Sequence, residues 1–229
     1  MKVLSISTSS KLCAVSILEN NNLIKEKILD SGLTHSEKLL PLIDDVFKET
    51  NLNLKDIDLL VCDKGPGSFT GIRIGISTVM AFSDSLNIPS IGISSLEALA
   101  YNVKNPGLIC SLIDAKNSNS YFALYKLENN VYTLLEKFCA EHIDTIINIL
   151  KKYNEKITFI GDGAICYKEI IKQAIEKCEF VDNNEINSYN LGLAGLYNYK
   201  IGNKNDILPL YLRKPQAERM LEAKLNGNK

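Results

Sequence analysis

Short apolar runs separated by polar turns open the chain, a pattern typical of β-strands. Two stretches share it: residues 3–27, VLSISTSSKLCAVSILENNNLIKEK, and residues 109–137, ICSLIDAKNSNSYFALYKLENNVYTLLEK. In each, a strand, a small polar turn, a second strand and an Asn-rich turn lead into a third strand. Because Asn tolerates positive φ, both Asn clusters predict hairpin turns. The shared order and spacing favour an internal duplication over two unrelated meanders.

Helical periodicity follows each of these stretches. Apolar residues recur on one helical face over residues 36–50, and a longer apolar helix is predicted over 68–86. Thr34 and Glu37 have the spacing of a capping box, and Pro41 predicts a kink or a helix start near Leu40. The remaining predicted elements are strands at 59–62, 90–93, 157–160 and 179–181 and helices at 143–153 and 165–177.

The same succession of elements is therefore present twice. Three antiparallel strands followed by alternating helices and strands indicate a mixed α/β fold, here as two similar lobes built from βββαβαβα units. We assign residues 1–103 together with 188–229 to an N-terminal lobe, and residues 104–187 to a C-terminal lobe. The tail, with helices expected at 191–199 and 217–225, is placed back on the first lobe.

Composition narrows the class of protein. Of the 229 residues, 45% are hydrophobic and 23% charged, as in ordinary globular proteins, and the net charge of −1 argues against strong independent binding of nucleic acid. Six cysteines without a CxxC pair and two distant histidines favour free thiols over a metal site or disulfides. With no signal-peptide pattern and no apolar stretch of about 18 residues, we expect a cytoplasmic protein without a membrane span.

The segment DKGPGSFTGIRIG, residues 63–75, follows a predicted strand and opens a helix. Free N–H groups at such a helix start suit an anion, although a Walker A motif is absent. Packing is the alternative, because Gly67, Gly71 and Gly75 recur every four residues and form a smooth helix face. We favour packing or a protein interface over phosphate binding, with Arg73 as a salt-bridge anchor or an interface residue.

Several other polar positions could contact a nucleotide, but each has a plainer explanation. The turn at residues 7–11 could cradle a phosphate or simply close a hairpin. Asp114 is either a metal-handling carboxylate or a turn cap, and Asp162 is either near a nucleotide or an N-cap. The candidate nucleotide-binding residues are Thr8, Ser9, Lys11, Gly65, Thr70, Asp114, Gly161 and Gly163.

Five segments together resemble the TsaB (YeaZ) family, and the match runs over essentially the whole chain. They are THSEKLLPLI at 34–43, GPGSFTGIRIGIS at 65–77, LIDAKNSNSYFALY at 112–125, GDGA at 161–164 and PLYLRKPQAE at 209–218. The resemblance implies an actin-like ATPase fold with two ribonuclease-H-like lobes. It also implies a role in forming threonylcarbamoyladenosine in tRNAs that read codons starting with adenosine.

The resemblance further implies partners. The family subunit pairs with a larger metal-binding homologue, TsaD, which transfers the threonylcarbamoyl group, and the small ATPase TsaE joins the pair. This chain is then expected to be a non-catalytic scaffold that reaches tRNA only through the complex and forms a homodimer when alone. It is expected to need no cofactor or metal of its own, with ATP or ADP at the complex interface.

The helices predicted at 36–50 and 68–86 are expected to form the contact with the partner. The candidate interface residues are Leu39, Leu40, Ile43, Gly67, Ser68, Phe69, Gly71, Arg73, Gly75 and Val79. A bulky residue at Gly75 should then disrupt partner binding and leave the isolated fold partly intact.

Comparison with the catalytic homologue predicts missing ligands. The two histidines of its HHMEGH-like motif would fall at Ser95 and Leu99, and neither residue is a good metal ligand. Ser7 stands where many relatives carry an Asp that could hold Mg²⁺, and Lys116 where Arg is common. Two alternatives stay open: a nucleotide-sensing actin-like module, and a metal-independent hydrolase like the glycoproteases for which such proteins were once named.

Overall fold

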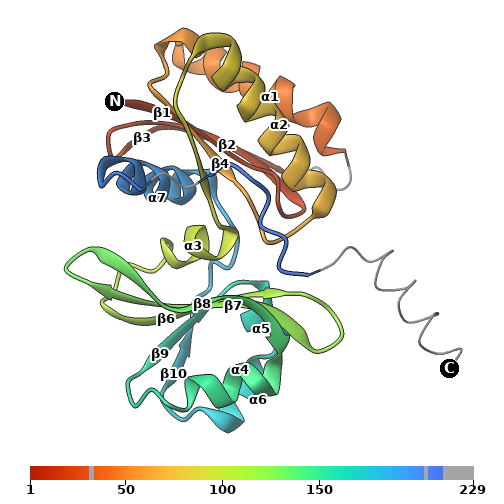
Figure 1. Ribbon diagram of the computed structural model, residues 1–229, viewed down its shortest axis with the longest axis vertical. Helices are drawn as coiled ribbons and strands as arrows, with labels where there is room; N and C mark the ends of the chain where they lie inside the picture. The colour runs from red at the N-terminus through yellow and green to blue at the C-terminus, as the bar shows by residue number, and fades with distance from the viewer. Residues whose placement is uncertain (31–33, 204–205, 214–229) are drawn as a thin grey trace, which may run out of the picture.

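The computed structural model describes residues 1–30, 34–203 and 206–213, and places them in two five-stranded sheets with helices between and outside them (Figure 1). The first sheet contains β1 (Lys2–Ser7), β2 (Leu12–Glu19), β3 (Asn22–Asp30), β4 (Leu59–Asp63) and β5 (Ser90–Ile93). The second contains β6 (Gly107–Asp114), β7 (Asn119–Glu128), β8 (Val131–His142), β9 (Ile157–Ile160) and β10 (Cys178–Phe180). The helices are α1 (His35–Thr50), α2 (Phe69–Leu86), α3 (Ser95–Ala100), α4 (Ile143–Leu150), α5 (Asp162–Cys166), α6 (Lys168–Ala174) and α7 (Ser188–Lys200), with a 3₁₀ turn at Leu54–Asp56.

The two sheets share one topology. Their strand orders are β3-β2-β1-β4-β5 and β8-β7-β6-β9-β10. In each sheet three antiparallel strands are followed by two that run parallel to the first. The Asn-rich turns have the predicted left-handed backbone, with φ of 54° at Asn20, 52° at Asn129 and 61° at Asn130. The duplicated α/β architecture predicted from the sequence is therefore confirmed.

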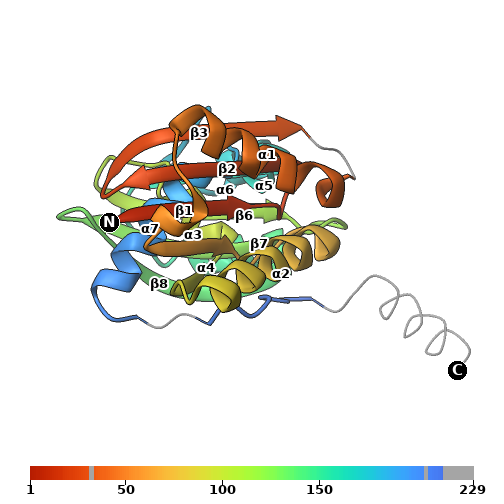
Figure 2. The ribbon, with the colours of Figure 1, turned by 90° about the horizontal axis from the view of Figure 1, so that it is seen from above.

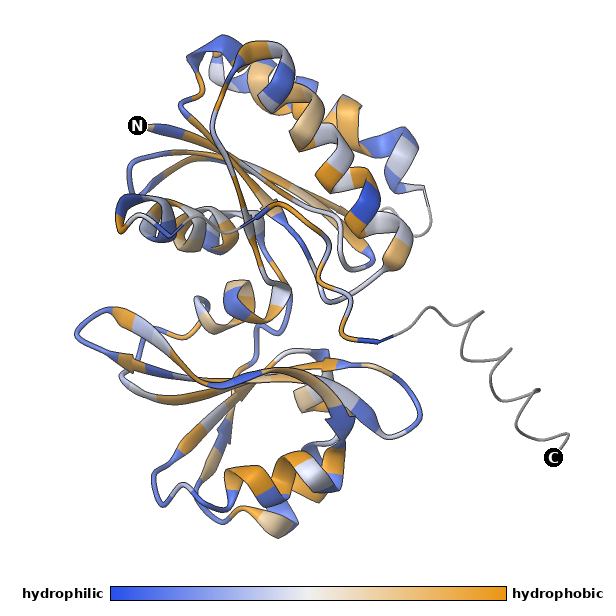
Figure 3. Cartoon of the chain, in the orientation of Figure 1, coloured by the Kyte–Doolittle hydropathy of each residue, from blue (hydrophilic) through white to orange (hydrophobic). Residues whose placement is uncertain are grey.

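Buried apolar side chains form three clusters between the layers. One lies between the first sheet and the helices α1 and α2, and another between the second sheet and α4, α5 and α6. The third lies around α3 and α7, which separate the two sheets (Figures 1 and 3), whereas α1 and α2 cover the outer face of the first sheet (Figure 2). This central cluster contains Val61 of the first sheet and Ile109 of the second, so the two lobes share apolar contacts. The lobe boundaries proposed from the sequence therefore stay a prediction.

Helix α7 packs directly on β1 and β2, although it is the last helix of the described residues. Two glycines permit this close approach. A Cβ atom on Gly192 would lie 2.7 Å from a methyl of Leu18, and one on Gly195 would lie 2.5 Å from Val61. Since interiors are close-packed, larger residues at these positions would separate the helix from the sheet.

Some elements differ in extent from the prediction. The helix expected at 165–177 is divided into α5 and α6 at Tyr167. Helix α1 begins at His35 and continues through Pro41, and the Thr34 side chain makes no capping bond. Helix α3 was not predicted, because it is short and almost wholly buried, so it has no amphipathic period. The helix expected at 217–225 lies outside the described residues. No helix in the described ranges has the length and apolarity of a membrane span.

Candidate functional site

A buried carboxylate, Asp63, ends β4 beside the end of β1, and it is 0% exposed. Its Oδ2 atom accepts hydrogen bonds from Ser7 Oγ at 2.8 Å and Ser9 Oγ at 2.5 Å. Its Oδ1 atom accepts from Ser95 Oγ at 2.6 Å and from the Gly65 N–H at 2.9 Å. These donors lie on the β1–β2 turn, the β4–α2 turn and α3. Asp63 therefore holds three separate segments together.

Ser7 does not supply a carboxylate at this corner, but β4 supplies a different one, Asp63. Burial raises the pKa of the Asp63 carboxyl above its usual range, and the four donors act in the opposite direction. Both carboxylate oxygens are already engaged, so Asp63 has little capacity left for a cation in this conformation. Among the described residues, no group of three or more His, Cys, Asp or Glu could hold a metal ion. Sequence analysis missed Asp63, although an acidic residue directly after an apolar strand was a usable signal.

Helix α3 carries the two positions, Ser95 and Leu99, at which the resemblance would place the histidines of the catalytic homologue. Ser95 is fully buried against Asp63, and Leu99 is 1% exposed and lines the neighbouring cleft. An engaged hydroxyl and an alkyl side chain are poor metal donors. Ser95 and Leu99 therefore lie beside the cleft but provide no strong metal ligand.

A cleft of about 620 Å³ opens between the lobes where β1 and β6 end. Its volume is within the range of small-molecule sites, about 300–1,000 Å³. Its charged lining residues are Lys11, Lys116, Asp114, Asp162 and Glu185. Cations and carboxylates thus face the same space, and the cleft is not a simple anion site.

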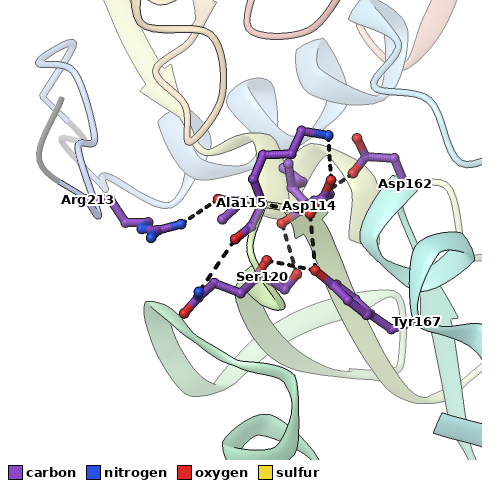
Figure 4. Close-up of polar contacts among 9 residues, drawn as sticks. Asp114, Ala115, Ser120, Asp162, Tyr167 and Arg213 are labelled. Atoms are coloured by element: carbon purple, nitrogen blue, oxygen red, sulfur yellow. Dashed lines mark hydrogen bonds and ion pairs between the residues drawn. The ribbon is translucent and has the colours of Figure 1, made fainter. Parts of the chain in front are cut away.

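The wall of the cleft on the second lobe is held by Asp114 (Figure 4). Its carboxylate accepts from the Lys116 N–H at 2.9 Å and Tyr167 OH at 3.2 Å, and pairs with Lys116 Nζ at 2.6 Å. Partial burial would raise the pKa of Asp114, but the Lys116 contacts outweigh it, so the pKa lies below its usual range. Asp162 Oδ1 accepts from the Asp114 N–H at 2.9 Å. Asp114 is therefore a turn cap, and Asp162 fastens α5 to β6 instead of acting as an N-cap.

Only part of the predicted nucleotide-binding set faces the cleft. Ser9, Lys11 and Asp114 line it. The others, which are not among its lining residues, are Thr8, Gly65, Thr70, Gly161 and Gly163. Gly161 and Gly163 serve packing, since a Cβ atom would lie 2.0 Å from Leu112 O on the first and 2.9 Å from Ser120 Oγ on the second.

The glycine face of α2 points into the molecule. A Cβ atom would lie 2.2 Å from Ser9 O on Gly67, 1.9 Å from Thr8 O on Gly71, and 2.5 Å from Thr8 Oγ1 on Gly75. Close packing of α2 on the β1–β2 turn, one of the two predicted roles, is thus confirmed. The expectation that a bulky residue at Gly75 would leave the isolated fold partly intact is corrected, because such a side chain would collide with Thr8 inside the lobe.

Several predicted interface residues are also internal. Leu39, Ile43 and Val79 are 1%, 5% and 0% exposed and belong to the core beneath α1 and α2. These three residues, together with Gly71 and Gly75, are not on the surface, so that part of the predicted interface is corrected. The residues of the set that are exposed are Leu40, Ser68 and Arg73. An exposed apolar side chain that the sequence analysis did not select, Met80, lies on α2 as well.

Residues 206–213 form a strap that passes from the first lobe to the second (Figure 1). Its Leu210 N–H donates to Lys64 O at 2.7 Å. The Tyr211 ring stacks on Phe69 with centroids 4.0 Å apart, and Arg73 Nε donates to Tyr211 OH at 2.8 Å. Arg213 then donates to Ala115 O at the edge of the cleft (Figure 4). The strap therefore connects the N-terminal end of α2 to the second lobe.

Glu97 on α3 predicts an unusual pH dependence. Its carboxylate accepts from Asn198 Nδ2 at 2.8 Å, and burial raises its pKa above the ordinary 4.5. The stability that a raised pKa gives is complete below the unfolded pKa and is lost as pH rises through the folded pKa. Urea unfolding from pH 4.5 to neutrality should therefore show the wild type losing stability relative to Glu97→Gln. Glu37→Gln, at an exposed position of α1, is the control and should follow the wild type; parallel curves for all three proteins would contradict the prediction.

Comparison with known proteins bears on what this arrangement serves. Residues 30–220 match the family model described as TsaD, tRNA N6-adenosine threonylcarbamoyltransferase. The tRNA threonylcarbamoyladenosine biosynthesis protein TsaB of Bacillus subtilis (strain 168) is 29% identical over 224 residues, 95% of this chain and 96% of that protein. The chain belongs to this family, and within it to the TsaB (YeaZ) proteins. The name of the TsaB relative refers to the biosynthesis of threonylcarbamoyladenosine in tRNA. The resemblance to the TsaB (YeaZ) family that the sequence predicts is confirmed.

Solved structures extend the comparison to the fold. YeaZ from Pseudomonas aeruginosa superposes with a TM-score of 0.78 at 24% identity, over 92% of this chain and 99% of that one. An activator of 2-hydroxyisocaproyl-CoA dehydratase from Clostridium difficile, solved with bound ADPNP, gives 0.52 at 14% identity over 89% and 97%. At such identities the likeness concerns the fold alone. The actin-like fold expected from the sequence is confirmed.

Proposed function

We propose that this chain is a non-catalytic scaffold subunit in the formation of threonylcarbamoyladenosine in tRNA. The observation that carries the proposal is the corner around Asp63 in a chain similar to TsaB proteins. There the buried carboxylate accepts hydrogen bonds from Ser7, Ser9 and Ser95 and has little capacity left for a metal ion. The described part of the chain offers no strong set of metal ligands, and we propose that the chain supports a homologue that binds the metal and catalyses the transfer. Its partners would be a TsaD-like transferase and a TsaE-like ATPase, with tRNA reached through the complex in the cytoplasm.

The decisive experiment is an omission assay. The chain, the TsaD-like subunit and the TsaE-like ATPase of the same cell are purified separately and mixed with unmodified tRNA, ATP and a preformed activated threonylcarbamoyl donor. We expect that leaving out this chain abolishes the modified nucleoside, while the chain alone gives none. Full modification without this chain, or nucleotide turnover by the chain alone, would contradict the proposal.

We place the partner contact on the outer faces of α1 and α2, centred on Leu40. This side chain is 55% exposed, and Met80 of α2 is 41% exposed. Large exposed apolar side chains on neighbouring helices are typical of association surfaces. When the partner is absent, the same faces would support a homodimer.

Leu40→Glu tests this surface without disturbing the core. We expect binding to the TsaD-like subunit to weaken by at least about tenfold, as for a buried interface anchor, and the homodimer to dissociate in sedimentation runs. Ile170→Glu on α6, at a position that is 45% exposed on the second lobe, is the matched control and should leave both assemblies intact. Equal effects of the two substitutions would contradict the assignment.

A nucleotide-binding role is the second candidate, and the cleft is the observation that favours it. Its 620 Å³ volume and the lining residues Ser9, Lys11 and Lys116 could accept a phosphorylated ligand. ATP or ADP in this cleft, or at the subunit interface, would be compatible with the scaffold role. Calorimetry of the isolated chain with each nucleotide separates a sensing module from a pure scaffold.

A further inference from the structure

A second pocket lies at the opposite end of the strands from the cleft. In the register of β1 and β2, Lys2 pairs with Glu19, so the Asn-rich turn after β2 lies at the start of β1, whereas the cleft lies at its end. The same holds for the turn after β7 in the second sheet. This pocket has a volume of about 310 Å³ and is bounded by both hairpin turns, the end of α3 and α7.

The aromatic wall of the pocket is rigidly built. Tyr101 stacks on Tyr132 with ring centroids 4.0 Å apart, and Tyr132 OH donates to Val103 O at 2.7 Å. Tyr101 is only 6% exposed, and its hydroxyl has no hydrogen-bond partner among the described residues. Tyr197 of α7 completes this wall. The pocket thus presents aromatic surface to a ligand.

The charge of the lining has one sign. Lys104 and Lys200 line the pocket, and none of the described residues that line it is acidic. Lys104 is positioned by bonds from its Nζ atom to Tyr101 O at 2.5 Å and Asn190 Oδ1 at 3.3 Å. Lys200 is exposed, in the last turn of α7, and forms no ion pair within the described chain. The pocket therefore suits an anionic ligand.

We infer that this pocket binds one nucleotide unit of an RNA strand. Aromatic rings suit a base, the amides of Asn21 and Asn130 at the rim can both donate to and accept from a base edge, and the lysines suit a phosphate. We assign this nucleotide to tRNA and not to a free mononucleotide, and this choice rests on the proposed function. The net charge of −1 does not oppose such a contact, because a pocket for a single nucleotide needs positive charge only in its own lining.

Fluorescence anisotropy of the full chain with labelled unmodified tRNA tests the inference, at low ionic strength, where a direct contact too weak to act outside the complex is strengthened. Lys200→Gln removes an exposed ammonium group, and Tyr197→Leu keeps an apolar side chain but removes the ring. Each substitution should weaken tRNA binding, with about a tenfold loss for Tyr197→Leu. Lys152→Gln, which changes an exposed lysine outside the pocket, is the control and should bind tRNA like the wild type.

Competition decides the source of the nucleotide. Unlabelled single-stranded oligonucleotide should displace the tRNA, whereas AMP and inorganic phosphate at equal phosphate concentration should not. Displacement by AMP alone would assign the pocket to a free nucleotide and overturn the RNA assignment. Unchanged binding by both pocket variants would overturn the site itself. Neither result depends on modification activity, so the scaffold proposal would stand or fall separately.

Discussion

Gly71→Ala is expected to destabilise the N-terminal lobe by about 3 kcal/mol, the range of overpacking in a filled interior. The added methyl group would start 1.9 Å from Thr8 O, and that atom belongs to backbone that is itself held by the neighbouring Ser9–Asp63 bond. Neither the helix nor the turn can move without breaking other contacts. The free energy of unfolding in urea measures the effect.

Ser77→Ala on the same helix is the matched control. Ser77 is exposed, and alanine is the better helix former, so its substitution should be neutral or slightly stabilising. If both variants unfold like the wild type, the close approach of α2 to the β1–β2 turn is not present in solution. If Gly71→Ala does lower the free energy of unfolding, a loss of partner binding by this variant follows from the disturbed fold and not from a surface contact.

Asp63→Ala should cost about 4 kcal/mol, because it leaves several buried donors without an acceptor at once. The hydroxyls of Ser7, Ser9 and Ser95 and the Gly65 N–H all depend on this carboxylate. The three segments that it joins should loosen together, which amide hydrogen exchange at the β1–β2 turn and the start of α3 would report.

Two further variants make this result interpretable. Ser95→Ala removes one of the four hydrogen bonds and should cost about 1 kcal/mol, and Asp84→Ala removes an exposed carboxylate of α2 and should change little. Asp63→Ala is predicted to exceed both. A cost no larger than that of Ser95→Ala would mean that Asp63 does not organise this corner.

Elements whose apolar residues recur with a helical or strand period could be predicted from the sequence, and elements without such a period could not. The duplicated meanders, the Asn turns and α2 follow from local patterns, and the sheet orders agree with them. Helix α3 has no visible period because α7 and the second sheet bury it. Strand and helix patterns say which residues face inward, but they do not say whether an apolar face such as Leu39 and Val79 meets its own core or a partner.

The polar site was harder to predict for the same reason. Asp63 is important because of contacts with residues more than 30 positions away, Ser7, Ser9 and Ser95, and no local pattern contains them. Asp114 and Asp162 were identified as candidates, but their mutual fastening through the Asp114 N–H also depends on tertiary contact. The glycines of GDGA were read as ligand-facing, whereas steric contact with Leu112 and Ser120 explains them.

The placement of α7 on β1 and β2 has a consequence for synthesis on the ribosome. Residues 104–187 are contiguous and contain all five strands of the second sheet, so this part can fold as soon as it has emerged. The first sheet, although translated earlier, lacks the cover of α7 until residue 200 has left the exit tunnel. The lobe that is made first is therefore completed last, and its apolar face is the one that a chaperone would need to shield.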